Sequence, residues 1–428
     1  MKTYRTGFLV LSILLGLITI SSVLSAQDRE TPEVVLEAYS EGFYRPHLLM
    51  YSEVDFLFMD NLQVAEAFLS QLTYAIDWSG YVAFARESDS LFVGPDEIPR
   101  TDNPSIILRV KISGDSTAVR ANLYLSEPHQ SPYFSVSYSF TEEQVELYAE
   151  AAAEEVLRQI TGMTAPFRSR IACVQRSEGN VKELVLVSWD GKYRWNLTQD
   201  GSIALSPSWN PDGKQIVFSS FRAGGDADLY IADFDQKRIR LLLEREGTDA
   251  APTWSPKGDK IVFAGSSGMN TKLYKIDVSD GHLQKITTGR GIDTSPSWSP
   301  TGREIVFMSD RTGRPHIYRM DSDGANLRRL TRDGNYNADP SWSPSGDRII
   351  YVRREEKGFQ LRSMDLTGDV DIPLTDEPGD HLDPAWSPDG MKITYSYQGK
   401  IWVMNADGTR RRPLLADGLM PSWSPILK

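Results

Sequence analysis

The side chains that most often carry out catalysis are few in this sequence and lie far apart along it. The five histidines are His47, His129, His282, His316 and His381. None of them forms a His-Glu-x-x-His motif, and the sequence contains no Gly-x-Ser-x-Gly, P-loop or dinucleotide-binding glycine motif. The single cysteine, Cys173, cannot form a disulfide within the chain, and we expect it to be a buried apolar side chain. The sequence therefore predicts a protein without enzymatic activity and without a resident cofactor.

Acidic and other polar side chains gather instead just before a repeated Pro-x-Trp sequence. They are Thr248, Asp249, Asp293, Thr294, Asn337, Asp339, His381 and Asp383. If the repeats form a ring, these residues begin its inner strands and surround one mouth of a central channel. Four carboxylates at one mouth could hold Ca²⁺ or attract a basic group of a partner protein. The alternative interpretation is solvated charge on separate repeats.

The repeat that would position these side chains has the form Pro-Ser-Trp-Ser-Pro-x-Gly, with variants. Its tryptophans are Trp209, Trp254, Trp298, Trp342, Trp386 and Trp423. Successive tryptophans are 44 or 45 residues apart, except for the last two, which are 37 apart. A period of about 44 residues is typical of the blades of a β-propeller. One tryptophan at a fixed place in each blade predicts packing between blades rather than a platform for a ligand.

Each repeat contains the pattern of four antiparallel strands. In the second copy, the strand that carries tryptophan ends at a turn over residues 255–258, where Ser, Pro and Gly occupy the positions that a type I turn favours. Apolar residues at 261–263 and 273–276 predict the next two strands, and Asp280-Gly281 predicts the hairpin that leads to the fourth. Four such strands make one propeller blade.

The first and last repeats are each incomplete, and they complement one another. Residues 168–206 lack the strand that carries tryptophan, although Ile171, Ala172 and Cys173 match the strand that follows it in the other repeats. A spare strand of the missing kind lies at the end of the sequence, around Trp423. Because an open array would leave unpaired edges, residues 168–428 are predicted to form an all-β six-bladed β-propeller closed by the C-terminal strand.

Residues 27–165 show no repeat and mix helical with strand patterns. Apolar spacing predicts a helix at 63–76, and alternation predicts strands at 105–112, 118–125 and 133–140. Thr141 and Gln144 form a capping box for a second helix, which we expect to end at Gly162. This region is predicted to be a small N-terminal α/β domain, so the whole chain is multidomain.

Residues 1–26 have the anatomy of a secretory signal peptide, with basic Lys2 and Arg5, an apolar stretch and small residues up to Ala26. No second apolar run of that length follows, so we expect no membrane insertion of the mature chain. Lys and Arg number 46 and Asp and Glu number 58, which gives a net charge of −12. Because phosphate binding needs clustered basic residues, this composition argues against nucleic acid as a partner.

The order of signal peptide, α/β domain and propeller resembles the TolB family, the periplasmic component of the Tol–Pal envelope complex of Gram-negative bacteria. The junction carries the resemblance most clearly. Residues 154–162 read Glu-Glu-Val-Leu-Arg-Gln-Ile-Thr-Gly, and residues 165–172 read Ala-Pro-Phe-Arg-Ser-Arg-Ile-Ala. The sequence Pro-Ser-Trp-Ser-Pro at 421–425 is similar to the closing strand of the family.

The resemblance implies a monomeric, non-enzymatic periplasmic scaffold that supports outer-membrane integrity and constriction at cell division. It implies that the propeller mouth binds a Pal-like peptidoglycan-associated lipoprotein, and that residues 27–40 bind a TolA-like inner-membrane protein. Thr294 matches a threonine with which the family contacts Pal, whereas Thr248 replaces a histidine of the family. Two alternatives remain: a regulatory or substrate-gating propeller of a peptidase-like system, and a periplasmic glycan-binding propeller.

Overall fold

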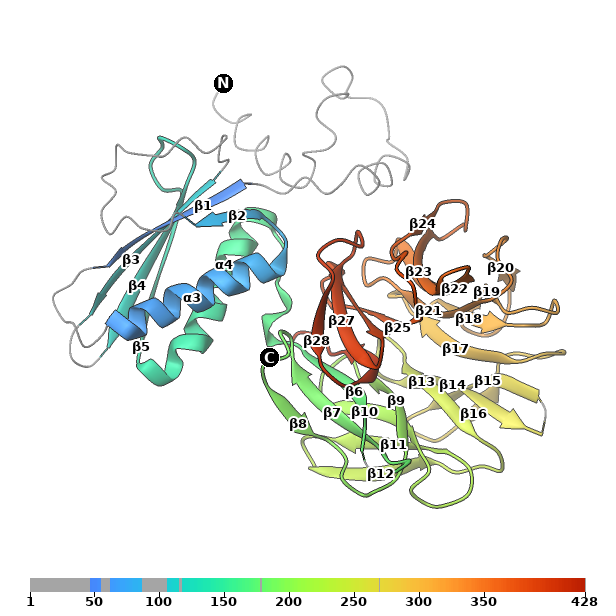
Figure 1. The fold of residues 1–428 in the computed structure, drawn as a ribbon. Helices are drawn as coiled ribbons and strands as arrows, with labels where there is room; N and C mark the ends of the chain where they lie inside the picture. Colours follow the sequence, from blue (N-terminus) through green and yellow to red (C-terminus); the bar gives the residue numbers. More distant parts are fainter. Residues whose placement is uncertain are drawn as a thin grey trace. The chain divides into compact units, whose positions relative to one another are not determined.

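The computed structural model describes residues 47–54, 62–86, 106–114, 118–177, 179–268 and 270–427 (Figure 1). The chain divides into two compact units, Met1–Phe167 and Arg168–Lys428. The predicted signal peptide at 1–26 and the predicted partner-binding segment at 27–40 lie outside the described residues. In the described part of the chain, no helix is both long enough and apolar enough to cross a membrane.

The N-terminal unit is built on a mixed five-stranded sheet with the strand order β2-β1-β3-β4-β5. The strands are β1 (His47–Val54), β2 (Ala83–Arg86), β3 (Ile106–Gly114), β4 (Val119–Ser126) and β5 (Phe134–Phe140). β1 runs parallel to β2 and β3, whereas β4 runs antiparallel to β3 and β5. The three predicted strands correspond to β3, β4 and β5, and β1 and β2 are additional.

Helices α3 (Leu62–Ser79) and α4 (Val145–Thr161) pack against each other, and α4 also packs against β5 (Figure 1). The apolar residues at the predicted spacing in α3, such as Phe68 and Leu72, are fully buried. Phe68 stacks on Phe140 of β5, with ring centroids 4.7 Å apart. The helices thus cover the sheet with the apolar faces that the sequence predicts, and the expected small α/β region is present.

Both ends of α4 follow the local sequence signals. The helix is preceded by a 3₁₀ turn (Glu142–Gln144), and the Thr141 backbone N–H donates to Gln144 Oε1 at 3.2 Å. At the other end, Gly162 has a φ of 73° and its N–H donates to the Arg158 carbonyl oxygen. Glycine is favoured there because a side chain disfavours this left-handed conformation. A second 3₁₀ turn, Pro166–Arg168, follows.

The described residues of the C-terminal unit form six four-stranded antiparallel sheets. Five of them use consecutive strands: β9 (Ala204–Trp209), β10 (Gln215–Ser220), β11 (Asp228–Asp233) and β12 (Arg238–Leu243); β13 (Asp249–Trp254), β14 (Lys260–Ser267), β15 (Asn270–Asp277) and β16 (Leu283–Lys285); β17 (Asp293–Trp298), β18 (Glu304–Ser309), β19 (His316–Asp321) and β20 (Arg328–Arg329); β21 (Asn337–Trp342), β22 (Arg348–Glu355), β23 (Gly358–Asp365) and β24 (Asp371–Pro373); β25 (His381–Trp386), β26 (Lys392–Tyr397), β27 (Lys400–Asn405) and β28 (Arg412–Leu415). This is the propeller-like arrangement that the repeat predicts.

The remaining sheet joins the two ends of the C-terminal unit. It consists of β6 (Arg170–Arg176), β7 (Lys182–Ser188), β8 (Arg194–Asn196) and β29 (Leu419–Trp423), in the order β29-β6-β7-β8. In the antiparallel pair of β29 and β6, Trp423 lies opposite Ile171 and Ser422 opposite Ala172. The Ser424 N–H donates to the Arg170 carbonyl oxygen at 2.7 Å. The strand at the end of the sequence therefore supplies the one that residues 168–206 lack.

The strands that carry tryptophan, β9, β13, β17, β21, β25 and β29, are called the inner strands below. Each contacts the next, and β29 contacts both β25 and β9. The tryptophans lie between neighbouring sheets: Trp298 packs with Val262 and Leu273 of the preceding sheet, and its Nε1–H donates to the Thr253 carbonyl oxygen at 3.3 Å. The predicted packing role of tryptophan is confirmed. Cys173 is fully buried, as predicted, and burial raises the pKa of its thiol to about 12.

Candidate functional site

Each inner strand contains the same backbone irregularity one residue before its proline. The residues concerned are Ser206, Ala251, Ser295, Asp339, Asp383 and Met420, with φ between 47° and 52°. The strand pairing shifts register at this point, as it does between Thr294 and Ser297 in β17. A non-glycine residue in this conformation costs about 1–3 kcal/mol. Because a β-bulge redirects side chains, the residues that begin an inner strand and those at the bulge have different surroundings.

Asp293, which begins β17, is fully buried inside a cluster of charged groups. Its carboxylate accepts from Lys272 Nζ at 3.1 Å, from Arg311 Nη2 at 2.9 Å and from the Ser309 hydroxyl at 2.6 Å. Lys272 is itself only 3% exposed and also donates to the Gly291 carbonyl oxygen. Lys272 comes from the preceding sheet, so this cluster ties two sheets together at the start of the inner strand.

Asp249 has the same place in β13 and is also fully buried. It forms an ion pair with Arg245, whose Nε lies 3.3 Å from Asp249 Oδ2. Burial raises the pKa of the Asp249 carboxyl, Arg245 opposes this effect, and the negative charge of nearby Asp228 adds to it. Asp249 is therefore another buried, paired group rather than a free charge at an opening.

Asn337, at the start of β21, replaces the carboxylate with an amide and is fully buried. Its Nδ2 lies 3.1 Å from His316 Nδ1, and its Oδ1 accepts from Arg353 Nε at 3.1 Å. Burial, together with nearby Arg329, Arg314 and Arg353, lowers the pKa of His316 to about 4. His316 is therefore neutral at pH 7, and the pair of Asn337 and His316 is an uncharged counterpart of Asp293 and Lys272.

His381 begins β25 and is 1% exposed. Its ring stacks on that of Tyr397, with centroids 4.2 Å apart and an interplanar angle of 6°. Its Nδ1 lies 3.3 Å from the Phe359 carbonyl oxygen, and burial lowers its pKa. The imidazole is thus a buried group packed between the Tyr397 ring and the Phe359 carbonyl oxygen.

An arginine beside the start of the inner strands recurs in four sheets and was not foreseen from the sequence. Arg222, Arg245, Arg311 and Arg353 lie over Tyr230, Tyr274, Tyr318 and Tyr351, with distances to the ring centroids of 4.7, 4.5, 5.3 and 5.5 Å. Three of these arginines also bond to the first residue of an inner strand. The available signal was the arginine that follows the second strand at Arg222 and Arg311, whereas Arg353 lies within the second strand of its sheet, β22.

Asp339 and Asp383 occupy the bulge position in the neighbouring inner strands β21 and β25, and both are partly exposed. The Ser295 hydroxyl donates to Asp339 Oδ1 at 2.9 Å, and the Ser396 hydroxyl donates to Asp383 Oδ2 at 2.8 Å. Burial, followed by the negative charge of Asp383, raises the pKa of Asp339 to about 6. These two carboxylates therefore lie near each other.

Two threonines of the predicted site are partly exposed. Thr248 precedes β13, and its backbone N–H donates to the Ser266 hydroxyl at 2.8 Å. Thr294 is the second residue of β17, between buried Asp293 and the bulge at Ser295. The threonines thus stand beside the buried cluster, with side chains that a partner could reach.

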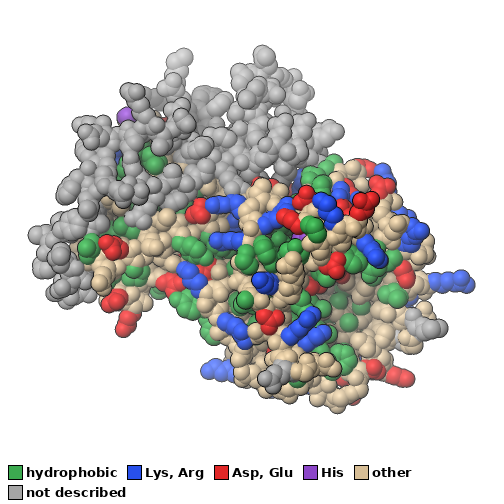
Figure 2. All heavy atoms as spheres, in the orientation of Figure 1, with side chains coloured by type: hydrophobic (Ala, Val, Ile, Leu, Met, Phe, Trp, Pro, Cys, Tyr) green, Lys and Arg blue, Asp and Glu red, His purple; other side chains and the backbone are tan. Residues whose placement is uncertain are grey.

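The predicted ring of four equivalent carboxylates is therefore corrected. Asp249 and Asp293 are buried in ion pairs, whereas Asp339 and Asp383 sit at the bulge. Among the described residues, no group of three or more His, Cys, Asp or Glu side chains is placed to hold a metal ion. Basic and acidic side chains are interspersed on the visible face rather than gathered by sign (Figure 2).

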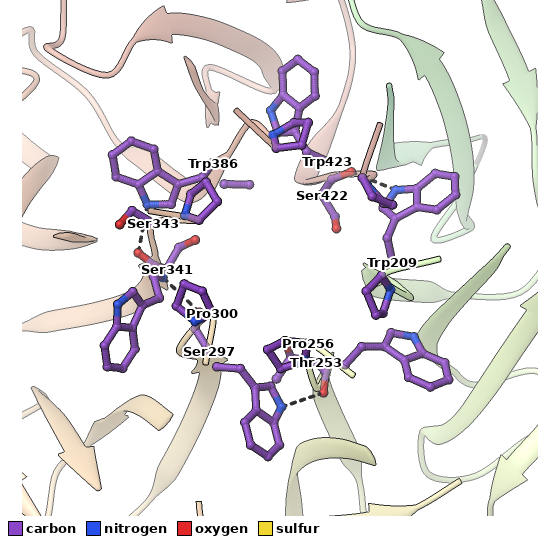
Figure 3. Close-up of a pocket in the computed structure, with 18 of the residues that line it drawn as sticks. Trp209, Thr253, Pro256, Ser297, Pro300, Ser341, Ser343, Trp386, Ser422 and Trp423 are labelled. Atoms are coloured by element: carbon purple, nitrogen blue, oxygen red, sulfur yellow. Dashed lines mark hydrogen bonds between the residues drawn. The ribbon is translucent and has the colours of Figure 1, made fainter. Parts of the chain in front are cut away.

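A cavity of about 440 Å³ lies where the inner strands end, and the sequence analysis did not anticipate it. It is lined by the tryptophan of each of the six inner strands and by the proline two residues after it. Figure 3 shows these residues in a ring, with the indoles of Trp209, Trp386 and Trp423 directed away from its centre. Two of these indoles donate to the preceding inner strand, Trp386 to the Ser341 carbonyl oxygen and Trp209 to that of Ser422. The tryptophans therefore build the wall of the cavity.

The fold and the polar residues at the starts of the inner strands define a propeller-like protein in which hydrogen bonds and ion pairs tie these strand starts to their neighbours. Residues 157–427 match the family model described as TolB beta propeller domain, and the chain belongs to this family. A Tol-Pal system protein TolB from Desulfosudis oleivorans is 37% identical over 97 residues, which are 23% of this chain and 22% of that protein. One from Roseobacter denitrificans is 32% identical over 142 residues, or 32% of each chain. The matched segments thus span a third or less of these relatives.

The solved structures support the fold over a longer part of the chain. The crystal structure of TolB from Acinetobacter baumannii has a TM-score of 0.75 and 22% identity, and covers 89% of this chain and 97% of that one. A structure of a nidogen/laminin complex has a TM-score of 0.51 with 8% identity over 61% of this chain. Similar propellers therefore occur in unrelated proteins, and function has to be inferred from the site.

Proposed function

We propose that this protein is a periplasmic, non-enzymatic scaffold of a Tol–Pal system that binds other proteins at the mouth formed by the starts of its inner strands. The observation that carries the proposal is the match of residues 157–427 to the TolB propeller family. The Tol-Pal names of the relatives support it. The periplasmic location rests on the predicted signal peptide at 1–26.

The six sheets are proposed to be the blades of one closed propeller, with β29 as the closing strand. The pairing of β29 with β6 and the contacts of β29 with β9 and β25 support this arrangement. A closed ring fixes six inner strands relative to one another, so the loops and side chains at their starts form one preorganised surface. Such a surface suits protein binding because little ordering is needed when the partner arrives.

The proposed partner at this mouth is a Pal-like peptidoglycan-associated lipoprotein. Thr248, Thr294, Asp339 and Asp383 are the site residues left partly exposed, and we assign the contacts to them. Asp249, Asp293, Asn337 and His381 are assigned a supporting role, since all four are buried. A TolA-like inner-membrane protein is proposed to bind residues 27–40, and the two contacts together would support outer-membrane integrity and constriction at division.

The test is a calorimetric titration of the mature protein with the purified periplasmic domain of the Pal-like lipoprotein of the same organism. Thr294→Ala should weaken binding about tenfold, as expected for a contact near the centre of an interface. Thr301→Ala is the matched control, because Thr301 is an exposed threonine at the opposite end of β17, in the turn to β18. Equal affinities of the wild type, both threonine variants and Asp339→Asn would overturn the assignment of the mouth.

A further inference from the structure

The outer edge of β5 is an unusual feature of the N-terminal unit. β5 is the last strand of its sheet, and within the described residues no strand pairs with its outer edge (Figure 1). All seven residues, Phe134–Phe140, pair with β4 in one continuous register without a bulge. Every second backbone N–H and C=O of β5 therefore points away from the sheet, ready to pair with another strand.

Proteins normally protect such an edge, and β5 carries none of the usual protection. Exposed edge strands tend to be short, bulged or occupied by lysine or proline, which discourages pairing with another chain. The sequence of β5 is Phe-Ser-Val-Ser-Tyr-Ser-Phe, without a charge, a proline or a glycine. By this criterion the edge is suited to pairing with a further strand.

The sequence of β5 also identifies the strand that it would fit. It is nearly symmetric about Ser137, with Ser135 matching Ser139 and Val136 matching Tyr138. In an antiparallel pair of two copies centred on Ser137, each serine faces a serine and each apolar residue faces an apolar residue. Such pairing keeps the apolar side chains on the helix-covered face of both sheets, where an extended segment of arbitrary sequence would not.

A second observation points to the same edge. Large apolar side chains that are mostly exposed occur at two described positions of the N-terminal unit, Tyr133 at 52% and Leu147 at 61%. Tyr133 immediately precedes β5. Leu147 lies one turn before Ala151 on α4, and the Ala151 carbonyl oxygen accepts from the Tyr138 hydroxyl of β5 at 3.4 Å. Leu147 and Ala151 are four residues apart and so lie on the same face of α4, the helix whose Ala151 carbonyl oxygen contacts β5.

We propose that two copies of this protein associate through antiparallel pairing of their β5 strands about a two-fold axis at Ser137. The two five-stranded sheets then form one continuous ten-stranded sheet, and Tyr133 and Leu147 of each copy flank the junction. This replaces the expectation of a monomer. A seven-residue junction buries less than the roughly 1,200 Å² of a standard interface, so we expect weak association with a Kd of about 10 µM.

The two-fold axis makes a charge-swap test possible. Ser137→Lys and Ser137→Glu each place like charges opposite one another in the proposed dimer, and Ser137 is exposed, so neither change should disturb the fold. Sedimentation velocity of the mature chain, from about 1 to 100 µM, should show each variant associating about tenfold more weakly than the wild type. An equimolar mixture of the two should regain association, because a lysine then faces a glutamate. Ser137→Ala, which removes only the hydroxyl and its bond to Asn122 Oδ1, should dimerise normally.

Three results would overturn the proposal: a wild type that stays monomeric throughout this range, a dimer that both charged variants leave unchanged, or a mixture that fails to associate. Leu147→Gln provides an independent arm, since the side chain is exposed and the variant should fold normally. It should weaken association several-fold without changing the melting temperature. Because neither position lies at the propeller mouth, these outcomes are separable from those of the lipoprotein titration.

Discussion

The most direct test of how the mouth is built is to neutralise the buried carboxylate of Asp293. Asp293→Asn keeps the size of the side chain but leaves Lys272, which is 3% exposed, without its counter-charge. Breaking a buried ion pair on one side costs about 3–5 kcal/mol, because the remaining charge is desolvated and uncompensated. Arg311 is less affected, since it is 18% exposed and also lies over Tyr318. We expect the melting temperature of the C-terminal unit to fall by about 10 °C.

The chain itself provides the rescue for this variant. In the next sheet, an asparagine and a histidine, Asn337 and His316, occupy the places that Asp293 and Lys272 have here. Adding Lys272→His to Asp293→Asn copies that pair, so the double variant should recover at least half of the loss. Differential scanning calorimetry of the two single variants and the double variant gives the coupling energy directly.

The control is a pair of similar length that differs in burial. Lys214 Nζ and Asp235 Oδ2 are 2.7 Å apart, but their side chains are 58% and 64% exposed. Asp235→Asn should leave the melting temperature unchanged, because an exposed pair is screened by water and salt. Equal effects at Asp235 and Asp293, or a double variant that is less stable than either single variant, would refute the role assigned to the buried cluster.

Two further predictions concern Asp339 and the C-terminal strand β29. Because the pKa of Asp339 is raised from 3.8 to about 6, the folded protein binds this proton more tightly than the unfolded chain, and stability falls as pH rises between about 4 and 6. Asp339→Asn should therefore nearly match the wild type in urea unfolding at pH 4 and exceed it by about 2–3 kcal/mol at pH 7.5; a constant difference would contradict this. Deleting residues 421–428 removes buried Trp423 and leaves β6 without its pairing strand, so cooperative unfolding in calorimetry should be lost. A truncated protein that melts like the full chain would rule out closure by β29.

Local features that recur in every repeat are predicted well from the sequence. The inner strands recur with their tryptophans, and the hairpin glycines Gly281, Gly324 and Gly408 all have positive φ, as the Asp-Gly pairs predict. β1 was not predicted, because it is a single strand whose partners β2 and β3 are parallel and distant in the sequence. Pairing of that kind leaves no signal in a local pattern.

The burial of the candidate site residues could not be predicted from the sequence. Asp293 and the bulge residue of the same strand are two positions apart, and residues two apart share a face in a regular strand. The sequence analysis therefore placed Asp293 and Asp339 together among the four carboxylates that could surround one mouth. The residue before each proline has a left-handed backbone conformation, so this rule does not hold at the bulge. The ammonium group that pairs with Asp293 belongs to Lys272, 21 residues earlier in the preceding sheet.

The buried first residues and the bulge residues of the inner strands have different surroundings. The first residues of β13, β17, β21 and β25 differ in chemistry, from carboxylate to amide to imidazole, yet all four are buried. Their task is to hold the start of each inner strand in place. At the bulge, two residues further along the strand, Asp339 and Asp383 are partly exposed. The bulge carboxylates also join neighbouring strands, because Asp339 Oδ1 accepts from the Ser295 hydroxyl and Asp383 Oδ2 accepts from the Met420 N–H of β29. We therefore expect substitution of Asp293, Asp339 or Asp383 to destabilise the inner strands more than substitution of partly exposed Thr294.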